Sequence, residues 1–259
     1  MVAFALIFIS LGFIGGLAAG VLGFGGGVLM FPLLYFIPPI FGMERLDANT
    51  VAAIVVSQVF FSTLSGGVAH SRTGRVNWRI AFIAGATSAV GSFVGGLASK
   101  WLPEKFLLLL FGIVTLAVAG MMFLTVPDPD QQNVPVDKVI VPVFPLALSS
   151  TLIGIIIGLL GAGNFLFVPL LTYFLRVPIR IAIGSSLFIA MMNTASAFIG
   201  KLITAQVPMP ATALVVLGAI IGALIGEKIH KRVSTKTLRF AYGTVVTAVA
   251  IPIWVSILW

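Results

Sequence analysis

The chain has 259 residues, of which 59% are hydrophobic and only 8% are charged, and its mean hydropathy is +1.18. A composition this apolar excludes an ordinary soluble domain, and the length suffices for about eight membrane-spanning helices of roughly 20 residues each. The formal charge of +8 is therefore attributed to basic loops beside an anionic lipid surface and not to nucleic-acid binding.

The composition also limits the chemistry. No cysteine is present, which excludes disulfides, thiolate metal ligands and cysteine nucleophiles. No polar stretch is long enough for a soluble catalytic domain, so we expect no enzyme activity, no cofactor and no metal. The N-terminal segment contains Ala18-Ala19-Gly20, which is similar to a cleavage site. It lacks a charged beginning, however, and we expect it to be a membrane segment and not a signal peptide.

Eight apolar segments follow one another along the chain, and we expect each to give one net crossing of the membrane. An acidic, proline-bearing stretch separates the first four from the last four. We interpret residues 1–126 as a first transmembrane repeat, 127–139 as an extracytoplasmic linker and 140–259 as a second repeat. The predicted fold is an all-α polytopic membrane protein with segments at 3–37, 48–70, 78–99, 105–126, 140–176, 180–201, 209–229 and 238–258.

The first segment of each half contains a glycine cluster. Gly23-Phe-Gly-Gly-Gly27 precedes Pro32-Leu-Leu34, and Gly161-Ala-Gly-Asn164 precedes Pro169-Leu-Leu171. Glycine clusters and proline weaken a helix, and a break at membrane depth must be buried in protein or line a cavity. Matched breaks in two halves indicate the substrate site of a transporter. We therefore predict a broken helix at each place, with Pro32 and Pro169 as the helix-break prolines.

The two halves also match beyond the glycine clusters. The matching positions are separated by 137 residues at the prolines, by 134 at Ala48 and Ala182, and by 131 further on. The 131-residue matches include Val76/Val207, Gly91/Gly222, Gly95/Gly226, Lys105/Lys236 and Gly112/Gly243. Glycines spaced by four, at Gly91/Gly95 and Gly218/Gly222/Gly226, are typical of close helix packing, and we expect that role and not ligand binding.

No ionisable residue lies near the middle of any apolar segment. This argues against a proton relay and against membrane enzymes that use paired carboxylates or metal clusters. Backbone groups would then bind the substrate. A helix that restarts after a glycine cluster presents unpaired N–H groups and the positive end of its dipole, which together favour an anion. Two such ends facing one cavity would hold a small oxyanion, and the candidate residues are Gly23, Gly25, Gly26, Gly27, Gly161, Gly163 and Asn164.

Neutral polar side chains in the second segment of each half extend this prediction. Ser57, Gln58, Asn193 and Thr194 lie near mid-segment, and Asn49, Thr50, Ser185 and Ser186 lie about two turns earlier. We assign all of them as candidate substrate-binding residues; interhelical hydrogen bonding is the alternative for each. Arg75 and Lys201 lie in corresponding segment-to-loop regions. They are candidates for guiding an anion, and solvated loop charges are the alternative.

Charge counting predicts the orientation. With one net crossing per segment, ten basic residues fall on one side and five on the other, the five being Arg72, Arg75, Arg79, Lys138 and Lys201. The ten indicate the cytoplasm, so both termini and the linker are predicted to be extracytoplasmic, although the arginine cluster argues against this. Four crossings per half make the two repeats parallel; if the glycine segments double back, an inverted arrangement becomes possible.

Together these motifs resemble the sulfite exporter TauE/SafE family, also called the toluenesulfonate uptake permease family. The doubled glycine and Pro-Leu-Leu sequences carry the resemblance, and Gly74-Arg-Val-Asn-Trp78 is similar to the family's entry to the third segment. The resemblance implies transport of small sulfur-containing anions, such as sulfite or sulfonates, across the cytoplasmic (inner) membrane. The second copy departs from the first, because Asn164 stands where a glycine is expected, which makes the two half-sites unequal.

We therefore predict an anion transporter, with the anion between the two glycine breaks and export driven by an interior-negative potential. The expected partners are the anion and the lipid bilayer. Rival interpretations are an anion channel or facilitator, and a structural membrane protein without transport. The sequence leaves open the sulfur anion, the direction, any coupling ion, and whether the chain forms a homo-oligomer.

Overall fold

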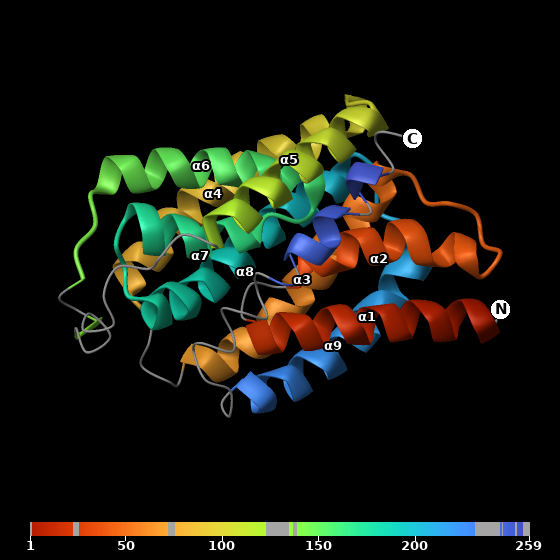
Figure 1. Cartoon of the computed structure of the whole chain (residues 1–259), viewed down its shortest axis with the longest axis horizontal. Helices are drawn as coiled ribbons and strands as arrows, with labels where there is room; N and C mark the ends of the chain where they lie inside the picture. Colours follow the sequence, from red (N-terminus) through yellow and green to blue (C-terminus); the bar gives the residue numbers. More distant parts are fainter. Residues whose placement is uncertain are drawn as a thin grey trace.

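The computed structural model describes residues 2–22, 26–71, 76–122, 135–136, 139–230, 244, 246–251 and 253–255. Within these ranges all regular structure is helical, as expected (Figure 1). The longer helices are α1 Val2–Leu22, α2 Gly27–Ile40, α3 Ala48–Ser71, α4 Trp78–Ala98, α5 Glu104–Met122, α6 Val143–Leu160, α8 Ile179–Ile203 and α9 Met209–His230. Shorter elements are η1 Ser99–Trp101, η4 Asn164–Leu166, α7 Phe167–Pro169 and the π-helical η5 Leu170–Phe174.

Within the described residues, six helices are long and apolar enough to cross a membrane: α1, α3, α4, α6, α8 and α9. Helix α5 and the apolar helix Val246–Val255 correspond to the two other expected segments. Many large apolar side chains on the outer helices are exposed, among them Phe82 and Val90 on α4 and Leu217 and Ile221 on α9. Such a surface suits lipid and would be unfavourable in water. The chain is therefore an all-helical integral membrane protein.

Two helix pairs are packed so closely that only glycine fits between them. A Cβ atom built on Gly218, Gly222 or Gly226 of α9 would lie 2.0–2.4 Å from a backbone carbonyl oxygen of α1. Gly91 and Gly95 of α4 approach carbonyl oxygens of α6 in the same way, at 2.2 and 2.3 Å. The expected packing role of these glycines is confirmed. Each pair joins a helix of residues 1–126 to a helix of residues 140–259.

The glycine contacts also give the helix directions. Along α1 and α9, Gly12 faces Val215, Gly16 faces Ala219 and Gly20 faces Ala223, so the two helices run parallel. By the same argument α4 and α6 run parallel, because Gly91 faces Thr151 and Gly95 faces Ile155.

Two hydrogen bonds orient α8. Near its start the hydroxyl of Ser185 accepts from the backbone N–H of Asn77, which precedes α4. Near its end Lys201 donates to Ser99, which follows α4. We call the two ends of the bundle the Asn77 end and the Lys201 end. Helices α4, α6 and α8 begin at the Asn77 end, and α1 and α9 begin at the Lys201 end.

Helix α2 doubles back instead of continuing α1. A Cβ atom on Gly26 would lie 2.1 Å from the carbonyl oxygen of Gly15, which is inside α1. Further along α2, the Tyr35 hydroxyl donates to Glu104 at the start of α5, at the Lys201 end. Figure 1 shows α2 returning towards the side on which the N-terminus lies. The prediction that Pro32 breaks a helix is wrong, since Pro32 lies inside α2, which begins at Gly27.

The second half follows the same plan in the opposite direction. Helix α6 ends at Leu160, and Gly161 has φ 67°, a left-handed conformation that suits glycine. The helical segment Asn164–Phe174 then returns to the Asn77 end, where α8 begins. Pro169 lies at the change from α-helix to the wider π-helix. Helices α1 and α6, which open the two halves, therefore run in opposite directions.

This direction corrects the expected position of the linker. The Asn77 side-chain amide donates to the carbonyl oxygens of Val136 and Val139, at 2.9 and 3.0 Å. These residues therefore lie at the Asn77 end, whereas α1 starts at the Lys201 end (Figure 1). Val136 and Val139, at the end of the predicted linker, and the start of α1 therefore lie at opposite ends of the bundle, because α2 adds one traverse that the prediction of four crossings per half did not include.

Candidate functional site

The two interruptions meet against the middle of α3. A Cβ atom built on Gly27 would lie 3.4 Å from the Cα of Ala162, and 3.2 and 3.0 Å from the side chains of Val55 and Val59. Gly161 touches α3 one turn earlier, where its Cβ would lie 2.0 Å from the carbonyl oxygen of Ala52. Residues 51–59 of α3 are all fully buried. We call this place, where Gly27 faces Ala162, the crossing point.

Two helical segments start at the crossing point and leave it in opposite directions. Gly26 precedes α2 with φ 68°, and its carbonyl oxygen accepts from the N–H groups of Leu29 and Met30 at 3.2 and 3.1 Å. The second segment starts at Asn164, where the N–H of Leu166 donates to the carbonyl of Gly163 at 2.9 Å. The positive dipole ends of both segments are therefore directed to one place. Gly23 and Gly25 lie outside the described residues.

Three buried amide side chains have polar atoms without a protein partner. Asn164, at the second interruption, is 2% exposed, and neither its Oδ1 nor its Nδ2 forms a hydrogen bond. Asn193 on α8 is fully buried and is also unpaired at both atoms. Gln58 on α3 donates from Nε2 to Ser62 at 2.9 Å, but its Oε1 has no partner. An unpaired buried polar group costs about 1–3 kcal/mol, so these amides indicate positions where water or a ligand binds.

The hydroxyl groups among the predicted residues form local contacts instead. Ser57 donates to the carbonyl of Ala53 and Ser186 to that of Ile183, within their own helices. Thr194 donates to Ala190 in the same manner. Ser185 is an acceptor for the N–H of Asn77 and so ties α8 to the start of α4. The Ser185 bond is the interhelical alternative considered from the sequence, whereas the bonds of Ser57, Ser186 and Thr194 each lie within one helix.

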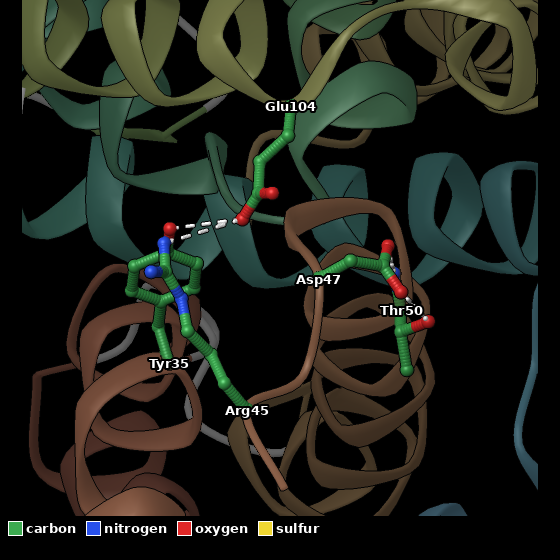
Figure 2. Close-up of polar contacts among 5 residues, drawn as sticks. All are labelled: Tyr35, Arg45, Asp47, Thr50 and Glu104. Atoms are coloured by element: carbon green, nitrogen blue, oxygen red, sulfur yellow. Dashed lines mark hydrogen bonds and ion pairs between the residues drawn. The ribbon is translucent and has the colours of Figure 1, made fainter.

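Asn49 and Thr50 lie at the Lys201 end and contribute to the start of α3. The Asp47 carboxylate accepts from the N–H and the hydroxyl of Thr50, at 2.9 and 2.7 Å (Figure 2). This is a helix N-cap contact. The side-chain amide of Asn49 donates to the carbonyl of Leu102 at 3.4 Å, a long bond, while its Oδ1 is unpaired. Thr50 thus stabilises the start of α3, two helical turns away from the crossing point.

Lys201 is buried, contrary to the alternative of a solvated loop charge. Its side chain is 0% exposed, and Nζ donates to Ser99 Oγ at 2.7 Å and to Gln206 Oε1 at 3.3 Å. Lys201 is in the last turn of its helix, where the sequence favours a solvated charge, so the sequence could not reveal that this lysine is buried. Arg75, the other residue predicted to guide an anion, lies outside the described residues.

A polar cluster at the Lys201 end was not predicted from the sequence. The Tyr35 hydroxyl donates to Glu104 Oε1 at 2.8 Å, and Arg45 lies 3.5 Å from the same oxygen (Figure 2). The Arg45 guanidinium also stacks 4.4 Å from the centre of the Tyr35 ring. These three residues tie the end of α2 to the start of α5. Tyr35 gives no such signal in the sequence, since an aromatic residue in an apolar segment is ordinarily part of the core.

Sequence comparison assigns this architecture to a family. The family model described as sulfite exporter TauE/SafE matches residues 8–253, almost the whole chain. The chain belongs to the sulfite exporter TauE/SafE family. The resemblance noted from the two glycine motifs is thereby confirmed, and the match covers both interruptions, α3, α8 and Lys201 of this TauE/SafE chain.

Similar proteins occur in distant bacteria and in an archaeon. A probable membrane transporter protein of Xylella fastidiosa (strain 9a5c) is 29% identical, covering 97% of this chain and 95% of the relative. YunE of Bacillus subtilis (24%; 90% and 91%) and MJ0441 of Methanocaldococcus jannaschii (25%; 92% and 91%) are also described as probable membrane transporter proteins. No solved structure matches the chain. This TauE/SafE chain is a membrane transporter, and no catalytic activity is indicated for its family.

Proposed function

We propose that this TauE/SafE transporter moves small sulfur-containing anions, such as sulfite or sulfonates, and that it binds them at the crossing point. The observation that carries this proposal is the unpaired, buried Asn164 side chain at the place where two helical segments begin. Its Nδ2 is a hydrogen-bond donor without an acceptor, and the dipoles of both segments favour negative charge. The class of anion comes from the family description alone.

Gln58 and Asn193 extend the binding site into α3 and α8. Gln58 is adjacent to Val59, which touches Gly27 at the crossing point. Helix α8, which carries Asn193, packs against both α3 and α7. Asn193 Nδ2 is a donor without a protein acceptor, whereas the unpaired atom of Gln58 is the acceptor Oε1, which would reach the anion through a bound water. Neutral amides can surround an oxyanion without the desolvation cost of a buried cation in the site itself.

The inverted helix directions support alternating access. In transporters with inverted repeats, substrate binds near the midplane where interrupted helices meet, and the repeats rock around that site. Here α2 and the segment Asn164–Phe174 leave the crossing point in opposite directions. We therefore place the anion between them, reached from one end of the bundle at a time.

The basic residues support an orientation with both termini outside. Among the described residues, the basic residues at the Lys201 end are Arg45, Lys100, Lys105 and Lys201, and those at the Asn77 end are Arg79, Arg176, Arg180 and Lys228. The sequence that connects the helices ending or beginning at the Asn77 end contains further basic residues, namely Arg72, Arg75, Lys138, Lys231, Arg232, Lys236 and Arg239. By the positive-inside rule the Asn77 end is cytoplasmic, and the linker with it. An interior-negative potential then drives export, by about 2.3 kcal/mol per charge per 100 mV.

Sulfite flux into sealed proteoliposomes, with and without an imposed potential, tests this function. We expect the flux to be saturable and to accelerate counterflow of labelled sulfite. The substitution Asn164→Leu should abolish this flux. Non-saturable flux without counterflow would favour a channel. Absence of flux for sulfite, thiosulfate, sulfoacetate and taurine would reject the substrate class. Gly26→Val is unsuitable as a test, since its side chain would collide with the backbone of Gly15 and prevent folding.

A further inference from the structure

Lys201 is a buried cation that the proposed site does not use. Among the residues whose burial the structure describes, it is the one basic side chain that is buried, at 0% exposed. It lies in the last turn of α8, inside an apolar segment long enough to span the membrane. Charged residues at such positions are costly, and those that persist commonly mark a substrate pathway.

The ammonium group has neutral partners and no ion pair in the described part of the chain. Ser99 and Gln206 accept two of its three N–H bonds. Both partners are fixed by other bonds, since Ser99 and Gln206 each donate to the carbonyl oxygen of Gly96, at 2.9 and 3.0 Å. The pocket around Nζ is thus formed by the ends of α4 and α8 and by the turn after α8. One N–H bond remains for a further acceptor.

Two features favour the charged form of this lysine, and neither is an ion pair. Helix α4 ends at Ala98 and α8 at Ile203, so the negative ends of two helix dipoles lie near the ammonium. Asp47 interacts with Lys201 electrostatically, but the two groups do not form an ion pair. The Asp47 oxygens instead accept the two bonds from Thr50.

We propose that the Lys201 ammonium binds the transported oxyanion at the Lys201 end and gives the transporter its preference for anions over zwitterions. This inference rests on the proposed function, because it adds a second binding position on the same pathway. The crossing point supplies neutral donors, and Lys201 supplies one full positive charge. A sulfur oxyanion would accept the third N–H bond, and a zwitterion such as taurine would meet repulsion between its own ammonium group and Lys201.

The test measures binding of sulfite and of taurine to purified protein in detergent by isothermal titration calorimetry. We expect Lys201→Gln to weaken sulfite binding about tenfold or more, because a hydrogen bond to a charged group is lost, and taurine binding less than about threefold. Lys201→Arg should restore the preference for sulfite. Thr115→Val on α5 is the control: it removes a fully buried hydroxyl that donates to the carbonyl of Phe111 within its own helix, so it lowers the melting temperature and leaves sulfite affinity within about twofold of wild type.

The outcomes separate this inference from the proposed function. Unchanged sulfite affinity in Lys201→Gln, or an equal loss for sulfite and taurine, would overturn the role of Lys201. If wild type binds chloride or nitrate but no sulfur anion, the substrate class fails, and the same variants then test Lys201 with that anion. If Lys201→Gln no longer binds that anion and Lys201→Arg binds it again, the inference about Lys201 is supported. Failure of wild type to bind any of these anions would overturn both proposals.

Discussion

Replacing Asn193 with leucine should separate the stability of this transporter from its activity. Asn193 is fully buried on α8, and neither of its side-chain polar atoms has a partner in the structure. Removing each of these two atoms should raise the free energy of unfolding by about 1–3 kcal/mol. Overpacking by the larger leucine should lower it by about 1–3 kcal/mol. We therefore expect Asn193→Leu to unfold at a temperature equal to or above that of wild type, although most buried substitutions destabilise.

The assay compares thermal unfolding in detergent, without ligand, with sulfite flux in proteoliposomes. We expect flux of Asn193→Leu to fall at least tenfold. The control is Thr115→Val on α5, a fully buried residue whose hydroxyl donates to the carbonyl of Phe111 at 2.8 Å. This variant loses a satisfied bond, so it should be less stable by about 1 kcal/mol and keep its flux. A destabilised Asn193→Leu with normal flux would refute the assignment of Asn193 to the substrate site.

Three further predictions concern packing, the cluster in Figure 2 and orientation. Gly222→Leu should prevent folding, because even a Cβ atom there lies 2.2 Å from the carbonyl of Phe13, whereas Gly120→Ala, with nothing within 4 Å, should fold normally; equal yields of monodisperse protein would contradict the packing argument. Tyr35→Phe should lower the free energy of unfolding by about 1–3 kcal/mol through loss of the bond to Glu104; a melting temperature equal to that of wild type would show that this bond contributes nothing. Since the chain has no cysteine, Glu44→Cys and Pro135→Cys, both at exposed positions, are clean probes of the two bundle ends. A membrane-impermeant maleimide should label Glu44→Cys from outside and Pro135→Cys only from the cytoplasmic side; labelling of both from one side would reject the inverted helix directions.

The local properties of this protein could be predicted from its sequence. Apolar segments near 20 residues long fix helices in a membrane, because backbone groups in lipid must be paired within the segment. The second glycine cluster predicts where a helix ends, since glycine and proline are intrinsically poor helix formers, and α6 ends at Leu160, directly before Gly161. Gly23 and Gly25 of the first cluster lie outside the described residues. Glycines spaced by four predict close packing because they lie on one helix face. The family resemblance follows from the same motifs.

The tertiary structure decided which of these elements meet and in which direction. Whether α2 continues α1 or doubles back depends on the left-handed backbone of Gly26 and its contact with Gly15, and no spacing encodes that choice. This one reversal changes the side on which the linker lies. Likewise, burial of Lys201 depends on Ser99 and Gln206, whose positions relative to the lysine are set by the packing of α4 against α8. Helix formation is a local property of a chain, whereas the partners of a buried charge are supplied by residues far away in the sequence.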